Sequence, residues 1–126
     1  MRIAYVDTSV LVAIGFNEPA GNTMADRLAG FDLVVAGDLL NAELLAAFRR
    51  ADTAPDPALT AGFSWIIPDR SLRREIDLVL RHASLRGADC WHLAAALYLA
   101  ETTRDLTFLT LDERQRQAAA AIGFAI

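Results

Sequence analysis

The sequence contains no lysine: all twelve of its basic residues are arginine. It has one cysteine, Cys90, so no disulfide can form within the chain and no cluster of thiolates can hold a metal. No apolar run approaches the roughly 18–20 residues that a membrane-spanning helix needs. The first residues, MRIAYVDTS, include neither a long apolar stretch nor a small-residue cleavage site, so we expect no signal peptide. These absences predict a cytoplasmic protein without a membrane partner.

The composition predicts a folded domain with a substantial core. Of the 126 residues, 54% are hydrophobic and 22% are charged, which is typical of one globular domain spanning residues 1–126. The net charge of −4 argues against nonspecific binding to nucleic acid. The charge is unevenly distributed, however, because residues 49–86 carry +2 and the rest of the chain carries −6. Such a chain can bind an anion through one region and a metal through another.

Short apolar runs alternate with helical patterns along the chain. Runs that fit strands are Arg2–Val6, Asp32–Ala36 and Thr107–Thr110, and Phe124–Ile126 is a candidate closing edge strand. Patterns that fit helices are Ser9–Ile14, Ala20–Ala29, a helix capped by Asp38 and running to about Ala51, Ser71–Ser84, Ala88–Glu101 and Asp112–Ile122. Pro57–Ile67 fits neither class. The alternation predicts an α/β fold, with a central parallel sheet flanked by helices in three α/β/α layers.

Four carboxylates occupy positions that point to a shared site. Asp7 directly follows the first predicted strand and Asp112 follows the TFLT strand by two residues, so both belong at the carboxyl edge of the sheet, where ligands bind in such folds. Asp89 lies in the first turn of a strongly apolar helix. Glu43 flanks the apolar stripe of its own helix, which directs its side chain toward the interior.

Each carboxylate also has a local explanation. Asp7 and Asp112 are suitable helix N-caps, and Gln115 follows Asp112 at the spacing of a capping box. Asp89, in the first turn of its helix, interacts favourably with the positive end of the helix dipole. Four such coincidences in one small domain are less probable than one shared cause. Clustered carboxylates repel one another unless a cation neutralises them, and a set of hard oxygen ligands suits Mg²⁺ or Mn²⁺.

Other residues complete this hypothesis. The hydroxyls of Thr8, Ser9 and Thr110 are placed to orient the ligands or metal-bound waters. The arginine stripe opposite the apolar face of residues 71–84 is more often a solvated face than a binding surface, but an RNA substrate would need positive charge beside an acidic pocket. The candidate substrate-binding residues are Arg74, Arg81 and Arg86, with Arg86 closest to the substrate.

The remaining distinctive side chains are assigned to structure or to partners. Cys90 and His92 share an apolar helix, so we expect both to be buried structural residues, although His92 can still hydrogen-bond near the site. Trp91 belongs to the core for the same reason. Trp65 is the better candidate for a contact with a partner or a second copy.

Four segments carry a resemblance to a known family: VDTSVLV at the start, DLLNAEL with Glu43, RGADCWHLAAA with Asp89, and FLTLDER with Asp112. In this order and spacing, the chain resembles a PIN domain, most closely a VapC-type toxin ribonuclease of a type II toxin–antitoxin system. The resemblance implies Asp7, Glu43 and Asp89 as an acidic triad and Asp112 as a more variable fourth acid.

The resemblance also implies an activity and partners. It implies an acidic pocket that binds Mg²⁺ or Mn²⁺, endonucleolytic cleavage of RNA, a homodimer, and inhibition by a cognate antitoxin protein that inserts into the acidic groove. One alternative stays open: a catalytically silent PIN-fold module that binds RNA or protein. A receiver-like phosphoacceptor is excluded, because its late lysine is missing.

Overall fold

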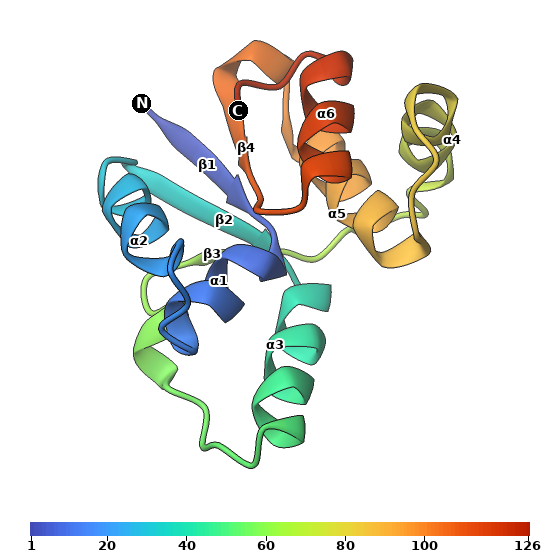
Figure 1. Ribbon diagram of the computed structural model, residues 1–126. Coiled ribbons are helices and arrows are strands. Elements are labelled where there is room, and N and C mark those ends of the chain that lie inside the picture. The colour runs from blue at the N-terminus through green and yellow to red at the C-terminus, as the bar shows by residue number, and fades with distance from the viewer.

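Four short strands form the central sheet of the computed structural model, which describes residues 1–126. All neighbouring strands are parallel, in the order β3-β2-β1-β4. The strands are β1 (Ile3–Val6), β2 (Leu33–Gly37), β3 (Ser64–Ile66) and β4 (Leu106–Leu109). Because the strands run in one direction, their carboxyl ends meet at a single edge, where α1 and α3 begin (Figure 1).

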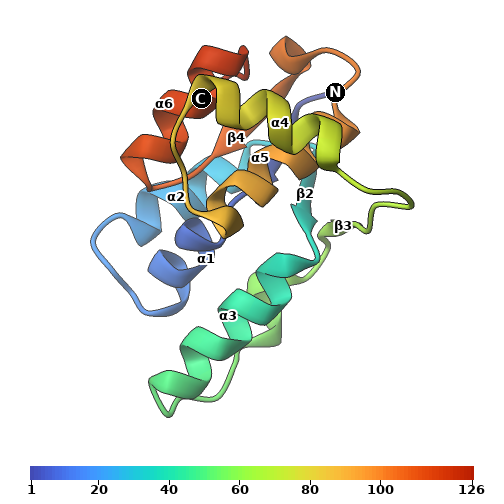
Figure 2. The same ribbon diagram turned by 90° about the vertical axis from the view of Figure 1, so that its right-hand side faces the viewer.

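Six α-helices cover the two faces of this sheet. They are α1 (Thr8–Gly15), α2 (Gly21–Ala29), α3 (Leu39–Arg50), α4 (Arg73–His82), α5 (Gly87–Leu99) and α6 (Glu113–Ile122), with 3₁₀ turns η1 (Pro57–Thr60) and η2 (Thr103–Asp105). Helices α1, α2 and α3 lie on one side and α4, α5 and α6 on the other (Figure 1). Figure 2 shows α4 as the outer helix of its layer, packed over α5.

The alternation of side chains along β1 divides the interior into two cores. Ala4 and Val6 point into a core shared with α1 and α3, whereas Tyr5, between them, points into a larger core shared with α5 and α6. All three side chains are completely buried. A strand buried on both faces explains why β1 reads as a continuous apolar run and not as an alternating one.

The predicted three-layer α/β fold is confirmed; the structure also assigns the one ambiguous segment and corrects one candidate strand. The unassigned segment Pro57–Ile67 contains η1 and the edge strand β3, which at three residues is too short to show a periodicity. The candidate strand Phe124–Ile126 makes only an isolated parallel bridge between Ala125 and Thr107. Phe124 is nevertheless buried, so packing and not strand pairing holds this segment in place.

Helix ends differ in whether an acid caps them. The predicted cap Asp38 is wrong: its carboxylate accepts a hydrogen bond from the side chain of Asn41 at 3.1 Å and none from the backbone. Its own backbone is already helical, so it does not have the extended backbone geometry of a capping residue.

Helix α6 ends at Gly123, whose φ of 112° is a left-handed conformation that favours glycine. None of the helices has the length and apolar character needed to cross a bilayer.

The close approach of α5 to the sheet depends on Gly37, at the end of β2. A Cβ atom at this position would lie 2.7 Å from the hydroxyl of Tyr5 and 2.7 Å from Cη2 of Trp91. The backbone N–H of Gly37 donates to the Tyr5 hydroxyl at 3.2 Å. Trp91 is partly buried and packs against the core, as predicted. Glycine is therefore needed here because an indole ring and a phenol occupy the space of a side chain.

We predict that Gly37→Ala lowers the free energy of unfolding by about 1–3 kcal/mol, because the methyl group forces Trp91 and Tyr5 to move. Urea denaturation measures this change. The matched control is Gly87→Ala, where no atom lies within 4 Å of the added Cβ, so stability should stay equal or rise slightly. Equal stability of Gly37→Ala and wild type would contradict the proposed packing.

Candidate functional site

Asp7 is a buried carboxylate at the carboxyl end of β1, with only 4% of its surface exposed. Its Oδ2 accepts hydrogen bonds from the backbone N–H of Ser9 at 3.2 Å and the Ser9 hydroxyl at 2.7 Å. The Thr110 hydroxyl, at the end of β4, lies 3.2 Å from the same oxygen. Asp7 is thus the N-cap of α1, but only one of its contacts is a capping bond. The others tie the ends of β1 and β4 together.

Gln115 joins Asp7 to two other elements. It lies on α6 and is completely buried. Its side-chain amide donates to Asp7 Oδ1 at 3.3 Å and to the backbone carbonyl of Asp89 at 3.2 Å, and its carbonyl oxygen lies 2.6 Å from the Thr110 hydroxyl. The sequence spacing identified Gln115 only as half of a capping box. Its side chain instead serves the site.

Asp112 has the local role that its position predicted. Its carboxylate accepts a hydrogen bond from the backbone N–H of Gln115 at 2.8 Å, which caps α6. In a full capping box the Gln115 side chain would return to the Asp112 N–H, but that N–H donates to the Thr110 hydroxyl at 3.1 Å. Asp112 therefore lies beside the network around Asp7 and is linked to it through shared neighbours.

Glu43 comes to this edge from α3 and is half-buried. Its Oε1 accepts a hydrogen bond from the Thr8 hydroxyl at 2.8 Å and lies 2.5 Å from Nε2 of His92. The hydrogen bond with His92 is the main reason that the pKa of Glu43 is lowered, and Thr8 and the positive charge of Arg86 contribute while partial burial opposes them. This interior orientation agrees with the position predicted for Glu43 beside an apolar stripe.

His92 connects the two acids from the opposite layer of the fold. It is completely buried on α5, as predicted, and its Nε2 lies 3.7 Å from Asp7 Oδ1 as well as beside Glu43. Its Nδ1 lies 2.8 Å from the Tyr5 hydroxyl. No sequence pattern revealed these contacts, because they join residues 49 and 87 positions apart. The neighbouring Cys90 is also buried, and burial raises the pKa of its thiol, which does not suit a nucleophile.

Asp89 is placed near the network, but its carboxylate pairs with Arg86 and has no hydrogen bond to Asp7, Glu43 or His92. Its Oδ2 lies 3.2 Å from Nε of Arg86, a side chain that is 85% exposed. Only its backbone carbonyl contacts Gln115. As the side chains stand, the structure contains no group of three or more His, Cys, Asp or Glu residues arranged to hold a metal ion. Asp7 and Glu43 are therefore brought together around His92, whereas Asp89 and Asp112 lie at the margin.

The other predicted arginines lie on a separate surface. Arg74 and Arg81 line an open depression between α4 and Leu97 of α5, and neither contacts any of the four acids. Neither arginine forms an ion pair, whereas their neighbour Arg70 is bound by Glu75 at 2.6 Å. Arg86 is thus the one candidate substrate-binding arginine that the structure places beside the acids. The pair Arg74 and Arg81 presents free positive charge on the face of α4.

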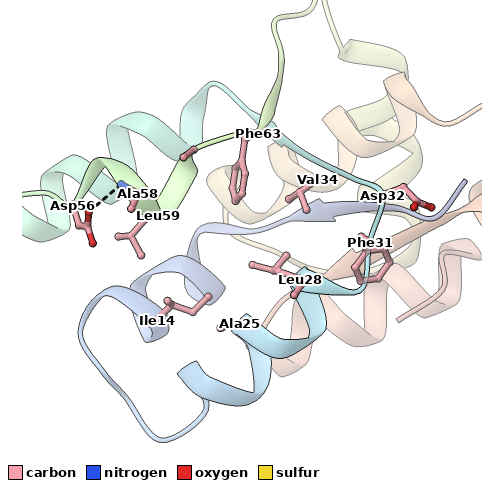
Figure 3. A pocket seen from close by; sticks show the side chains of 13 residues that line it. Ile14, Ala25, Leu28, Phe31, Asp32, Val34, Asp56, Ala58, Leu59 and Phe63 are labelled. Atoms are coloured by element: carbon pink, nitrogen blue, oxygen red, sulfur yellow. Dashed lines mark hydrogen bonds between the residues drawn. The ribbon is translucent and has the colours of Figure 1, made fainter.

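An apolar depression of about 450 Å³ lies between α1, α2 and η1, lined by side chains such as Leu28, Phe31 and Phe63 (Figure 3). Its two acids are already engaged: Asp56 caps η1 and Asp32 accepts a hydrogen bond from the backbone of Arg2. The rest of its lining is hydrophobic apart from Gly62. Trp65, proposed as a partner contact, is partly buried and packs against the core under these helices and near Phe63.

Comparison with known families supplies one match. The sequence matches the family profile described as PIN domain over residues 4–121, nearly the whole chain. No curated protein matched the chain, and no solved structure matched it either. The matched region includes every residue of the network around Asp7 and Glu43.

The Tyr5–His92 contact predicts a specific dependence of stability on pH. Burial raises the pKa of Tyr5 above its usual value of 10.0, so the phenol contributes stability that is complete below pH 10 and is lost as the pH rises further. We predict that Tyr5→Phe lowers the free energy of unfolding at neutral pH by about 1–3 kcal/mol, since Gly37 and His92 lose their partner. Urea unfolding from pH 7 upward should show the two proteins converging above pH 10.

The control is Tyr98→Phe, which removes a hydroxyl that donates to Asp69 near the surface. It should keep the alkaline loss of stability seen in wild type. Wild type and Tyr5→Phe curves that fall in parallel above pH 10 would contradict the assignment to Tyr5.

Proposed function

The chain belongs to the PIN domain family, and we propose that it is a metal-dependent endoribonuclease, the VapC-type toxin of a type II toxin–antitoxin pair. PIN domains are generally metal-dependent nucleases that bind RNA. The observation that carries the proposal is the network at the carboxyl edge of the sheet. Two acids that are 36 positions apart, Asp7 and Glu43, lie there at 3.7 and 2.5 Å from Nε2 of the same buried imidazole.

The donor set fits a hard divalent cation in its chemistry. Asp7, Glu43 and Asp89 supply carboxylate oxygens, the ligands that Mg²⁺ and Mn²⁺ prefer, and Asp112 would assist from the margin. Asp89 would have to leave Arg86, whose side chain is 85% exposed and stays solvated when the ion pair opens. A bound ion would supply a Lewis acid for the phosphodiester and lower the pKa of a bound water.

The residues of the chain itself would orient these groups. The Thr8 hydroxyl holds Glu43, and the hydroxyls of Ser9 and Thr110 hold Asp7, so each carboxylate has a fixed direction before any ligand binds. Once Asp89 turns inward, the guanidinium of Arg86 is free to pair with an RNA phosphate at the rim of the site. Arg74 and Arg81 would then contact phosphates farther along the strand.

The finer parts of this proposal rest on the resemblance of the four motifs. We propose that residues 1–126 act as one PIN domain, that two copies form a homodimer, and that a cognate antitoxin protein occupies the acidic groove. The alternative is a catalytically silent module that binds RNA or protein. It is favoured by one observation, the absence of a preformed set of three metal ligands. Cleavage of RNA by the purified protein distinguishes the two functions.

We predict that Asp7→Asn and Asp89→Asn each reduce RNA cleavage by at least about 100-fold. Loss of a residue that only hydrogen-bonds to a metal ligand lowers activity by about 10–100-fold, and loss of the ligand itself should lower it at least as much. The measurement is cleavage of a mixed pool of structured RNAs with Mn²⁺, with Mg²⁺ and with a chelator. Expression of wild type should also arrest growth of a bacterial host, and expression of Asp89→Asn should not.

The matched control is Asp38→Asn, which changes an exposed acid at the start of α3 whose carboxylate lies outside the network. It should cleave like wild type. Full activity in either ligand variant would overturn the site, and a folded wild-type protein that cleaves no RNA with any metal would favour the binding module.

Metal should also stabilise the folded protein. Binding to the native state alone raises the free energy of unfolding by about 2.7 kcal/mol at a concentration 100 times the dissociation constant. We predict that millimolar Mg²⁺ or Mn²⁺ raises the melting temperature of wild type, and that Asp7→Asn and Asp89→Asn lose most of this increase. Thermal unfolding followed by circular dichroism checks it. A wild-type melting temperature that does not respond to either ion would count against clustered ligands.

A further inference from the structure

His92 has an unusual position for a histidine inside an apolar helix. Cys90, Trp91, Leu93 and Ala94 surround it on α5, yet both ring nitrogens face polar groups from distant parts of the sequence. Nε2 lies beside Glu43 and 3.7 Å from Asp7, and Nδ1 lies beside Tyr5. With the ring 0% exposed, none of these contacts is shared with solvent.

The hydrogen bonds determine which nitrogen carries the proton. The Tyr5 hydroxyl already accepts from the backbone N–H of Gly37 at 3.2 Å, so its single proton remains to be donated. The polar atom placed to receive it is Nδ1 of His92, at 2.8 Å. Nδ1 is therefore an acceptor, and the ring carries its proton on Nε2, facing Glu43 Oε1 at 2.5 Å.

This bond restricts how the Glu43 carboxylate can point. Oε1 receives two donors, the Thr8 hydroxyl and the Nε2–H of His92, whereas Oε2 accepts no hydrogen bond from the protein. A glutamate side chain is long and flexible, so ordering it costs conformational entropy. The two hydrogen bonds to Oε1 order the side chain when the protein folds. Oε2 then remains available to a ligand in a defined direction. Metal ligands held in this way bind more tightly than unrestrained ones.

The chain of contacts extends from Glu43 into the sheet. Gly37 ends β2 immediately before Asp38 and α3, the helix that carries Glu43. Three hydrogen bonds follow one another: the Gly37 N–H donates to Tyr5, the Tyr5 hydroxyl to His92, and the Nε2–H of His92 to Glu43. They link the strand that precedes α3 with the carboxylate on α3 itself. His92 on α5 thereby connects the two layers of helices through the carboxyl edge of the sheet.

We propose that His92 is a positioning residue for the metal site, fixed by Tyr5 as an Nε2–H donor and orienting Glu43 for a divalent cation. The inference rests on the proposed function of the acidic site. It goes beyond the four acids by assigning a role to a buried imidazole and to the phenol behind it.

A pair of substitutions separates positioning from simple core packing. In His92→Gln the side-chain amide can reach the place of Nε2 and still donate to Glu43, whereas in His92→Asn the shorter amide reaches only the place of Nδ1. We expect His92→Asn to weaken Mn²⁺ binding by about 10–100-fold and His92→Gln to stay within a few-fold of wild type. Calorimetric titration of the protein with Mn²⁺ alone, without RNA, gives these affinities.

Two further measurements keep the proposal testable if His92→Asn does not fold. Tyr5→Phe touches neither acid and should weaken Mn²⁺ binding several-fold, because Nδ1 loses its donor. Nitrogen-15 NMR of wild type in the absence of metal should show His92 with a protonated Nε2 and a bare Nδ1. The opposite tautomer, with a bare Nε2 facing Glu43, would overturn the proposal without any variant.

The outcomes also separate this proposal from the proposed function. If folded His92→Asn binds Mn²⁺ as tightly as wild type, or if His92→Gln loses binding to the same extent as His92→Asn, the positioning role is wrong although the nuclease site stands. If wild type itself binds no Mn²⁺ and cleaves no RNA, the proposed function fails, and the role of His92 in it fails too.

Discussion

The burial of the Asp7 carboxylate is the constraint on which the arrangement of this edge depends. A carboxylate removed from water needs hydrogen-bond donors, and here they come from several directions. Ser9 supplies them from α1, Thr110 from the end of β4 and Gln115 from α6. Satisfying one acid therefore brings the starts of α1 and α6 and the ends of β1 and β4 to the same place. Glu43 lies next to this acid, because Nε2 of His92 is 2.5 Å from Glu43 Oε1 and 3.7 Å from Asp7 Oδ1.

The sequence predicted most of the fold, because most of the fold depends on local patterns. Apolar runs and helical stripes depend only on neighbours within an element, so the six helices and the strands β1, β2 and β4 were found within a few residues of their ends. The strand β3 was missed because it is an edge strand of only three residues, which is too short to show an alternation of apolar and polar side chains. Asp38 was wrongly predicted as the N-cap of α3. Aspartate is a common capping residue, but the backbone of Asp38 is already helical, which does not suit a cap.

The candidate site was predictable only in part, for a related reason. The positions of Asp7 and Asp112 at strand ends follow from the α/β rule, and the interior orientation of Glu43 follows from its helix. The roles of His92 and Gln115 do not, because each depends on partners in other layers. A capping-box spacing at Gln115 and an apolar helix around His92 both favoured structural explanations. Buried polar residues in apolar helices were the one available signal, since burial without partners is costly.

The charge on Asp89 connects the structure to the proposed chemistry. Its carboxylate lies against Arg86, so the proposed set of ligands would be completed only if this ion pair opens. Opening would expose Arg86 to a phosphate as it brings Asp89 to the metal, which couples assembly of the ligands to availability of a substrate contact. The Thr8, Ser9 and Thr110 hydroxyls need no rearrangement, because they already hold the other two acids.

The most direct measurement is a crystal structure of the protein grown with Mn²⁺, with the ion located by its anomalous scattering. The account predicts Mn²⁺ within about 2–2.5 Å of carboxylate oxygens from Asp7, Glu43 and Asp89, with Asp89 turned away from Arg86. Anomalous density only at other acids, or none in crystals in which Asp89 still contacts Arg86, would contradict the claim that these carboxylates form a metal site.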